Sequence, residues 1–437
     1  MTPADLTAAI PIDFLQGPVP AGTTVEAGEL GRRLGQARLD LLDLPVERVV
    51  SALDGFSARL LARDNPLHRR YPGAGLAYVA SWCRRRSLEP LLEESLGDPR
   101  ALDEYLVRGA RASRGLRAWP RGLVLHWMAG NVPTLGFLSL LMGLLTKNAN
   151  LVKVASSQDD LLARLLEGLA ETPGGAELTA AVAVARFSHS QLPQARAVSS
   201  LADVRVIWGS DESVATVRAL PSRLEALDLV FPNRVSFIVV GAGMLRQGDL
   251  KALAQRMAQD ISVFEQKACA SPHTVFLETE SQETLESFAR LLAEALQAAL
   301  RGLPKTPPSQ REVAALLNLR AEYDMFHQAW YSRGTEFTVL SDDKFQLGPA
   351  IGNRTIFLRR VADLAQVAQL ITPKVQSVGV AAEGAELDRL ADLLAARGVH
   401  RFARVGGMTS FDMPWDGFLL PQNLVRWTSR PVAASGQ

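Results

Sequence analysis

The chain has 437 residues, which is enough for two or three domains that each bury their own core. With 47% hydrophobic and 21% charged residues it is typical of a soluble globular protein, and a net charge of +1 argues against a dedicated nucleic-acid or anionic-membrane binder. Two cysteines and six histidines form no CxxC, HExxH or similar spacing, so we expect no metal site.

The N-terminal segment has no basic start, and acidic residues and a proline interrupt its apolar positions, so it is not expected to be a signal peptide. We therefore expect a cytoplasmic, reduced protein. Residues 25–118 read mainly as helices, and we treat 1–118 as a helical N-terminal region. Arginines recur every three or four residues, which favours a solvated helix face over a phosphate-binding face. They are Arg108, Arg111, Arg114, Arg117 and Arg121.

Residues 122–146 contain no charged side chain, and as a single helix they would be long enough to span a bilayer. The sequence GNVP at 130–133 interrupts them, because glycine and proline break helices and favour turns. We therefore predict a buried strand over 123–127, a tight turn, and a buried helix over 134–145.

The remainder alternates between short Val/Ile-rich runs and helical patterns, which indicates parallel βαβ units. In the first set, strands are expected at 150–154, 181–187, 204–209 and 234–240. One helix is expected to end near Ala170, and another is expected over 212–219. In the second set, strands are expected at 273–278, 355–361, 375–382 and 401–407, with helices over 282–300, after a Pro-rich break at 304–310, after 361 and up to Arg397. We predict two α/β lobes, 119–235 and 236–410, joined near 231–236, and a C-terminal tail over 411–437.

Cys269 is the first candidate for chemistry. The helical pattern of residues 249–264 runs into it, Pro272 ends that pattern, and a strand follows. A thiol in this position can act as a nucleophile, although a free cysteine is also often an inert core residue. Cys83 lies on a helical pattern followed by three arginines, where a packed thiol is favoured over a second nucleophile.

Three strand ends carry further candidates. Asn131 follows the first strand, where its amide can donate to an oxyanion or simply favour the turn. Lys153 ends the next strand and Ser156 lies just beyond it, as a ribose or phosphate contact or as a solvated strand end. Gly209 and Ser210 precede a helix, whose free N–H groups attract phosphate, although one Gly-Ser turn is far short of a GxGxxG fingerprint.

These candidate residues lie in segments whose order along the chain resembles that of a known superfamily. WPRGLVLHWMAGNVPTLGFLSLLMGLLTKNANLVKVASS, VRVIWGSDE, RVSFIVV and FEQKACASPH together resemble the aldehyde dehydrogenase superfamily, and within it the acyl-CoA reductase branch that includes bacterial luminescence fatty-acid reductases. The elements typical of the branch are HWMAGNVP, KNANLVK, QKACASPH, NRTIFLRRV, QSVGV and NLVRW. The resemblance covers roughly residues 115–430, and the first hundred residues match only loosely.

The resemblance implies an aldehyde-dehydrogenase-like α/β fold with two Rossmann-type lobes, one binding a nicotinamide cofactor and the other carrying the nucleophile. It implies that Cys269 is that nucleophile, and that the Asn131 side chain and the Cys269 backbone N–H hold the oxyanion. Lys153 would lie near the adenosine ribose, with Gly209 and Ser210 near the pyrophosphate.

The chain departs from the superfamily pattern at two positions. Oxidising members carry a glutamate base in an ELGGK-type segment, whereas LVFPNRVSF has Val230 or Phe231 there, so the thioacyl enzyme would persist for hydride or thiol chemistry. NAD-specific members often carry a glutamate three residues after the lysine. Ser156 stands there instead, which removes a charge that would repel a 2′-phosphate and favours NADPH over NADH.

The implied activity is NADPH-dependent reduction of a fatty acyl-CoA to the aldehyde through an S-acyl Cys269, with release of coenzyme A. Three alternatives stay open: reductive release from a carrier-protein phosphopantetheine or an acylated partner protein, aldehyde oxidation, and a noncatalytic assembly subunit. By analogy with the superfamily we expect a homo-oligomer.

Other side chains have less definite roles. The helix end before Cys269, Lys267 and His273 are candidates for activating the thiol. His126 is either a proton donor or, preferably, a hydrogen-bonded core histidine. Trp415, Asp416 and Trp427 are expected to pack the tail against the catalytic lobe, or to line an acyl pocket.

Overall fold

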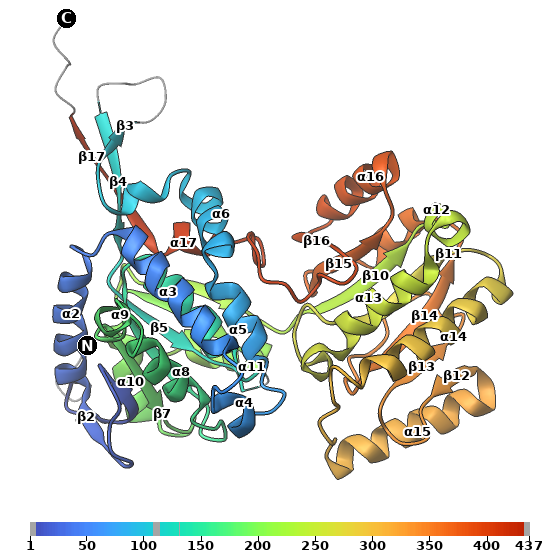
Figure 1. Cartoon of the computed structure of the whole chain (residues 1–437), viewed down its shortest axis with the longest axis horizontal. Coiled ribbons are helices and arrows are strands. Elements are labelled where there is room, and N and C mark those ends of the chain that lie inside the picture. Colours follow the sequence, from blue (N-terminus) through green and yellow to red (C-terminus); the bar gives the residue numbers. More distant parts are fainter. Residues whose placement is uncertain (1–5, 108–113, 131, 432–437) are drawn as a thin grey trace, which may run out of the picture. The chain divides into compact units, whose positions relative to one another are not determined.

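The computed structural model describes residues 6–107, 114–130 and 132–431. The backbone divides into two compact units (Figure 1). The first unit comprises Met1–Pro232 together with Phe418–Gln437, and the second comprises Asn233–Gly417.

The first unit is built on a seven-stranded sheet. Its strand order is β2-β1-β7-β6-β5-β8-β9, with β1 antiparallel to its neighbours and the other pairs parallel. The strands are β1 (Ala9–Leu15), β2 (Thr24–Glu26), β5 (Leu123–Trp127), β6 (Ala149–Val154), β7 (Val182–Arg186), β8 (Val204–Trp208) and β9 (Leu227–Phe231). Strands β5, β6 and β8 are buried along their whole length, which explains their continuous apolar character.

Residues 1–118, predicted as a helical region, also contribute β1 and β2 to this sheet, because β1 pairs with β7. Helices surround the sheet. They are α2 (Ala27–Leu41), α3 (Val46–Leu61), α4 (Leu67–Arg70), α5 (Leu76–Cys83), α6 (Arg85–Leu96), η1 (Pro99–Leu102), α7 (Leu135–Leu145), α8 (Leu161–Ala170), α9 (Gly175–Thr179), α10 (Leu192–Leu201), α11 (Asp211–Arg218) and α17 (Leu420–Asn423). Strand β5 and helix α7 confirm the predicted strand and helix in the uncharged segment. Within the described residues, no helix combines the length and apolarity that crossing a bilayer requires.

A separate three-stranded antiparallel sheet joins the tail to the first unit. Its order is β17-β4-β3, with β3 at Leu106–Val107, β4 at Arg114–Pro120 and β17 at Val425–Pro431. The predicted helical face of arginines is therefore wrong at Arg114 and Arg117, which lie on β4; Arg108 and Arg111 fall outside the described residues. Cross-strand pairing with β17 decides the structure here, because it satisfies the β4 backbone despite the helical spacing.

The second unit contains another seven-stranded sheet in the order β12-β13-β14-β11-β10-β15-β16, parallel except for β12. Its strands are β10 (Val235–Val240), β11 (Pro272–Glu278), β12 (Gln328–Tyr331), β13 (Thr338–Ser341), β14 (Thr355–Val361), β15 (Val375–Ala381) and β16 (Arg401–Arg404). Its helices are α12 (Ala242–Gln247), α13 (Leu250–Ser262), η2 (Val263–Gln266), α14 (Gln282–Ala299), α15 (Gln310–Phe326), η3 (Leu364–Leu370) and α16 (Gly384–Ala395).

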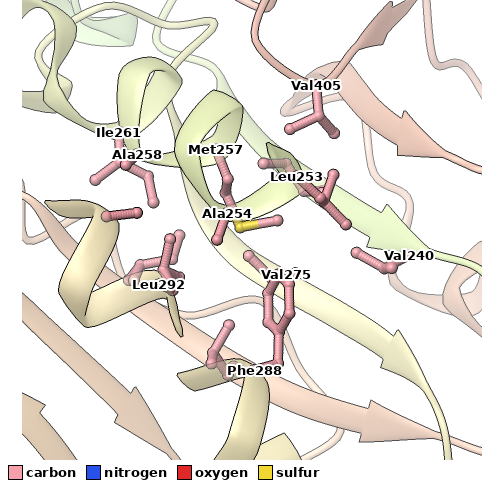
Figure 2. Close-up of a cluster of buried hydrophobic side chains, with 14 of the residues drawn as sticks. Val240, Leu253, Ala254, Met257, Ala258, Ile261, Val275, Phe288, Leu292 and Val405 are labelled. Atoms are coloured by element: carbon pink, nitrogen blue, oxygen red, sulfur yellow. The ribbon is translucent and has the colours of Figure 1, made fainter. Parts of the chain in front are cut away.

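Helix α13 anchors the segment that leads to Cys269. Its apolar residues recur at helical spacing, and Figure 2 shows them packed against α14 and the sheet. Leu253, Met257 and Ile261 are almost wholly buried, and each large side chain contributes about 1.5–3 kcal/mol through its burial. The packed end of α13 therefore provides a rigid starting point for the turn that follows.

Two predictions about chain segments are wrong. The helix expected to run into Cys269 ends at Ser262, and the backbone then turns into left-handed geometry. The tail is not packed as one piece on the catalytic lobe: Trp415 and Asp416 belong to the second unit, while Trp427 lies on β17 and pairs with Ala118 of β4 in the first.

Candidate active site

Cys269 follows an unusual turn. Phe264, Glu265 and Gln266 have φ values of 52°, 53° and 59°. These values lie in the left-handed region, which residues other than glycine rarely adopt. Each such residue costs about 1–2 kcal/mol, so contacts elsewhere must hold the turn.

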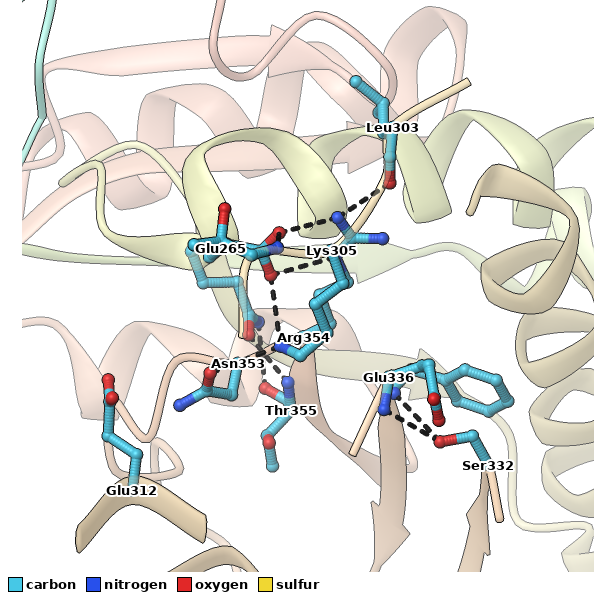
Figure 3. Close-up of polar contacts among 12 residues, drawn as sticks. Glu265, Leu303, Lys305, Glu312, Ser332, Glu336, Asn353, Arg354 and Thr355 are labelled. Atoms are coloured by element: carbon cyan, nitrogen blue, oxygen red, sulfur yellow. Dashed lines mark hydrogen bonds and ion pairs between the residues drawn. The ribbon is translucent and has the colours of Figure 1, made fainter. Parts of the chain in front are cut away.

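The carboxylate of Glu265 supplies the main contacts (Figure 3). It accepts hydrogen bonds from Arg354 at 2.7 and 3.1 Å and from Lys305 at 3.2 Å, and its backbone carbonyl accepts from the Asn353 N–H at 3.2 Å. Arg354 also donates to the Leu303 carbonyl at 2.9 Å. Because both cations are buried with Glu265, this cluster ties the turn to the segments before α15 and before β14.

The side chain of Gln266 ties together the two ends of the Cys269 loop. Its Nε2 donates to the carbonyls of Pro272 and Thr355, both at 2.9 Å, and its Oε1 accepts from the Thr355 N–H at 2.7 Å. All three bonds are buried, so the loop from 267 to 271 is held between the turn and β11.

Cys269 itself is half-buried at the amino-terminal edge of the second sheet. Its carbonyl accepts a hydrogen bond from Ser236 Oγ on β10 at 2.8 Å, and Ser236 Oγ in turn accepts a hydrogen bond from the Ser377 N–H on β15 at 3.3 Å. The neighbouring Gln376 is 1% exposed, and its Nε2 donates to Asp416 Oδ1 at 2.6 Å. A thiol, an amide and a carboxyl group therefore meet at this edge.

Burial, followed by the charge of Asp416, raises the pKa of the Cys269 thiol to about 12. Hydrogen bonding by Gln376 and by the backbone N–H groups of Ala270 and Cys269 opposes this rise. The resting site therefore holds a protonated thiol and carries donors suited to a thiolate or an oxyanion.

Two of the three expected activators supply no positive charge. Burial lowers the pKa of His273 to about 4, so the ring is neutral near pH 7, and its Nδ1 has no partner among the described residues. The nearest helix end is the C-terminal end of α13, which carries partial negative charge and disfavours a thiolate. Lys267 is exposed in the turn.

In the first unit, Lys153 lies at the carboxyl end of β6 and is 4% exposed. Its ammonium lies 5.0 Å from the ring centre of Trp127 and 5.2 Å from that of Phe187, and no carboxylate of the described residues pairs with it. Burial lowers its pKa to about 8. An unpaired ammonium at this sheet edge fits an anionic dinucleotide.

The turn at Gly209 and Ser210, predicted to bind a phosphate, is less suited to an anion than the surroundings of Lys153. Ser210 caps α11, and its Oγ accepts from the Ser213 N–H at 3.2 Å. The first turn of α11 already holds the carboxylates of Asp211 and Glu212, which complement the helix dipole and weaken the attraction for a phosphate. Gly209 precedes this cap, and Ser156 is exposed beyond β6.

His126 lies in the core of the first unit and is wholly buried. Its Nδ1 lies 2.7 Å from Ser139 Oγ and its Nε2 lies 3.1 Å from Asn150 Oδ1. Asn150 donates its own Nδ2 to the Asn148 carbonyl, so its oxygen accepts from His126 Nε2–H and the Ser139 hydroxyl donates to Nδ1. Burial lowers the pKa of His126 to about 4, and these contacts support the core interpretation over proton transfer.

The segment that replaces the glutamate base forms the end of β9. Phe231 is buried and stacks on Trp208 with 4.0 Å between ring centres, while Val230 is half-buried. The one carboxylate of β9, Asp228, is bound by Arg205 at 2.6 and 2.7 Å. This strand therefore offers no free base at its carboxyl end.

Asn131 lies outside the described residues, and its role stays a prediction. Cys83 is wholly buried and burial raises its pKa, as expected of a packed thiol. Across the described parts of the chain, no three His, Cys, Asp or Glu side chains are grouped as metal ligands.

Sequence reasoning missed several residues that the structure brings to these edges. Gln376 and Ser377 are consecutive polar residues inside an otherwise apolar strand, a pattern that could have indicated a role at the strand. Trp127 and Phe187 end or follow the strands on either side of β6, so parallel pairing places them beside Lys153. The sequence around Asp416 has no comparable pattern that would have indicated a role for this residue.

Solved structures with a similar fold are aldehyde dehydrogenases. Aldehyde dehydrogenase 21 from Physcomitrella patens matches with a TM-score of 0.68 and 12% identity, covering 97% of this chain and 98% of that one. A benzaldehyde dehydrogenase from Corynebacterium glutamicum matches with a TM-score of 0.63 and 14% identity, covering 97% and 94%. The chain therefore has the aldehyde-dehydrogenase-like fold that the sequence predicted.

Sequence comparison then identifies the family. The family model described as acyl-CoA reductase (LuxC) matches residues 39–427, and the chain belongs to this family. A long-chain acyl-protein thioester reductase of Aliivibrio fischeri is 27% identical over 360 residues, which cover 79% of this chain and 71% of that protein. Its counterpart from Photorhabdus luminescens is 26% identical over 390 residues, covering 85% and 77%.

The family and the fold together define the protein as an oxidoreductase that reduces acyl groups to aldehydes with a nicotinamide cofactor. The resemblance stated from the sequence is confirmed.

Proposed function

We propose that this chain catalyses NADPH-dependent reduction of a long-chain acyl thioester to the aldehyde, through an S-acyl intermediate on Cys269. The observation that carries the proposal is the placement of Cys269 in a braced loop beside an amide and two backbone N–H donors, while Cys83 is wholly buried.

An acylated protein is the acyl donor that we favour. Both relatives described above are named long-chain acyl-protein thioester reductases. The description of the family as acyl-CoA reductase supports acyl-CoA as the second candidate donor. Either donor presents a thioester to the same thiol.

In the proposed reaction, the sulfur of Cys269 attacks the thioester carbonyl, and the Asn131 amide and the Cys269 N–H hold the oxyanion. The donor thiol leaves with a proton, and the acyl group stays on Cys269. The nicotinamide cofactor, when bound, supplies the hydride that reduces this acyl group. The thiohemiacetal on Cys269 then collapses, which releases the aldehyde and restores the thiol.

The absence of a base on β9 supports reduction over hydrolysis. The end of β9 is filled by Phe231, which stacks on Trp208, and the Asp228 carboxylate is committed to Arg205. Without a positioned base, water attacks an S-acyl group slowly, because general-base catalysis contributes about 10²–10⁴-fold. Aldehyde oxidation to the free acid is therefore disfavoured.

Lys153 and Ser156 support a preference for NADPH. Lys153 offers an ammonium at the edge of the first sheet that no carboxylate of the described residues pairs with, and Ser156 adds no negative charge beyond it. A 2′-phosphate would gain from this positive potential and meet no carboxylate at position 156.

The test combines purified protein with NADPH or NADH and either long-chain acyl-CoA or an acylated carrier protein, and follows cofactor absorbance and aldehyde formation. We expect aldehyde from the acylated protein, with NADPH preferred and Cys269→Ser inactive. Turnover of acyl-CoA alone would favour the second donor. Reduction of NAD(P)⁺ by aldehyde with formation of free acid would refute the proposal, as would no turnover with any donor, which is expected of a noncatalytic subunit.

A further inference from the structure

Gln376 stands out among the polar groups of the second unit. It lies on β15 and is 1% exposed, so its carboxamide has to find its hydrogen bonds inside the protein. Its Nε2 donates to Asp416 Oδ1 at 2.6 Å, but its Oε1 is buried with no partner among the described residues. The oxygen of this buried amide therefore has no hydrogen-bond partner among the described residues, and one of its two N–H groups is not committed to Asp416.

Cys269 and Gln376 are tied to one edge of the sheet. Ser236 on β10 donates to the Cys269 carbonyl at 2.8 Å and accepts from the N–H of Ser377, the residue after Gln376, at 3.3 Å. Because β10 pairs with both β11 and β15, this serine fixes the separation between the Cys269 loop and the start of β15. The Cys269 loop and the Gln376 side chain are therefore neighbours at this edge, and hydrogen bonding by the Gln376 amide lowers the pKa of the Cys269 thiol.

We propose that Gln376 is a further catalytic residue, whose carboxamide donates a hydrogen bond to the sulfur of Cys269 when the thiolate forms, and that Asp416 is the positioning residue that holds this carboxamide. The inference rests on the proposed function, in which Cys269 carries the acyl group.

The geometry of the amide explains the division of roles. A carboxylate only accepts hydrogen bonds, so Asp416 fixes Nε2 and thereby decides which end of the amide faces it. The Nε2 group has a second N–H, which stays available for the sulfur. Asp416 is itself held in a left-handed backbone conformation, with φ of 47°, directly after the buried Trp415.

Gln376 and Asp416 have opposite effects on the pKa of the Cys269 thiol. Gln376 lowers the pKa of the Cys269 thiol, whereas the charge of Asp416 raises it. Burial raises the pKa of Asp416, while the hydrogen bond from the Gln376 amide and the charge interactions with Arg234 and His400 oppose that rise.

These opposite effects suit a thiol that is acylated and released in turn. A free thiolate meets both burial and the Asp416 charge, whereas the S-acyl form is neutral and meets neither. The hydrogen bond from Gln376 supports the thiolate while it attacks, and the site then favours the acylated sulfur. When the aldehyde leaves, the returning thiolate is readily protonated.

The test measures the alkylation rate of Cys269 by iodoacetamide between pH 7 and 11, using mass spectrometry of the peptide that contains it. Gln376→Leu removes the donor at similar volume, and Asp416→Asn removes the charge but keeps an acceptor for Nε2. Ser377→Ala is the matched control, since the Ser377 hydroxyl is buried on the same strand with no partner among the described residues, and its N–H bond is unchanged.

We expect Gln376→Leu to slow alkylation at pH 9 about tenfold or more, as the loss of a hydrogen bond to a charged group predicts. Asp416→Asn should accelerate it at the same pH, and Ser377→Ala should leave it unchanged. In the reductase assay, kcat of Gln376→Leu should fall about tenfold or more, with KM for the acyl donor nearly constant. Thermal melts exclude misfolding, and Gln376→Met replaces the leucine variant if that variant is unstable.

Alkylation of folded Gln376→Leu at the wild-type rate over the whole pH range would overturn the proposal, as would a slower rate in Asp416→Asn. The alkylation readout needs no substrate. If the wild-type protein reduces no acyl thioester, the proposed function fails, while opposite changes in the two variants still support the contact between Gln376 and the sulfur.

Discussion

Replacement of Glu265 by glutamine tests whether the buried ion cluster holds the Cys269 turn. The change keeps the shape of the side chain but removes its charge, and takes from Arg354 and Lys305, whose side chains are 1% and 7% exposed, the carboxylate with which both are paired. Breaking such a buried pair costs about 3–5 kcal/mol. For a unit of this size, 1 kcal/mol corresponds to about 2–4 °C, so the melting temperature of the second unit should fall by about 6–20 °C.

Differential scanning calorimetry measures this change, and Glu322→Gln on the exposed face of α15 is the matched control, with an expected effect within about 0.5 kcal/mol. Below the melting transition, Cys269 should also be alkylated at an altered rate, because the turn of residues 264–266 loses its main contacts. If Glu265→Gln melts within about 2 °C of the wild-type protein, the reasoning about this cluster is refuted.

Three further predictions concern the first unit. Burial lowers the pKa of Lys153 to about 8, so its positive charge is present below that pH and lost above it; NADPH binding, measured by fluorescence titration, should weaken between pH 7 and 9, and Lys153→Met should bind weakly at both. Val230→Glu places a carboxylate at the half-buried end of β9, and should raise the ratio of free acid to aldehyde in the product by up to about 100-fold, as quantified by chromatography. Asn131→Ala should lower kcat by about 100-fold or more in steady-state assays if its amide holds the oxyanion, and an unchanged kcat would exclude that role.

The sequence predicted the alternating core well because its signals there are local. The residues GNVP interrupt the apolar sequence between β5 and α7 whatever the tertiary structure, and the apolar runs of β6, β8, β11 and β15 reflect strands buried on both faces. Where pairing partners lie far away in the chain, the prediction failed. Strand β4 depends on β17, which lies about 300 residues further along, and no local pattern reveals that partner.

The turn before Cys269 was missed for the same reason. Its left-handed backbone opposes the local preferences of Phe264, Glu265 and Gln266, and it depends on Arg354 and Lys305. The helical pattern of α13 therefore seemed to continue, although the helix ends at Ser262.

The positions of Cys269 before β11 and of Lys153 at the end of β6 could be predicted from local patterns in the sequence, while their roles stay predictions. The candidate site was not predictable where the chemistry depends on pairs brought together by the fold. The Gln376 amide is oriented by its hydrogen bond to Asp416. Lys153 is shielded from solvent because the rings of Trp127 and Phe187 flank it. Neither pairing leaves a mark at a fixed sequence spacing.

The most direct test of the account is to trap the acyl enzyme. The protein is incubated with a long-chain acyl thioester in the absence of NADPH, quenched with acid, and analysed by intact and peptide mass spectrometry. We predict one added acyl group on the peptide that contains Cys269, no adduct in Cys269→Ala, and loss of the adduct as aldehyde when NADPH is added. A folded wild-type protein that acquires no acyl group from any donor, or acquires it on another residue, would contradict the central claim.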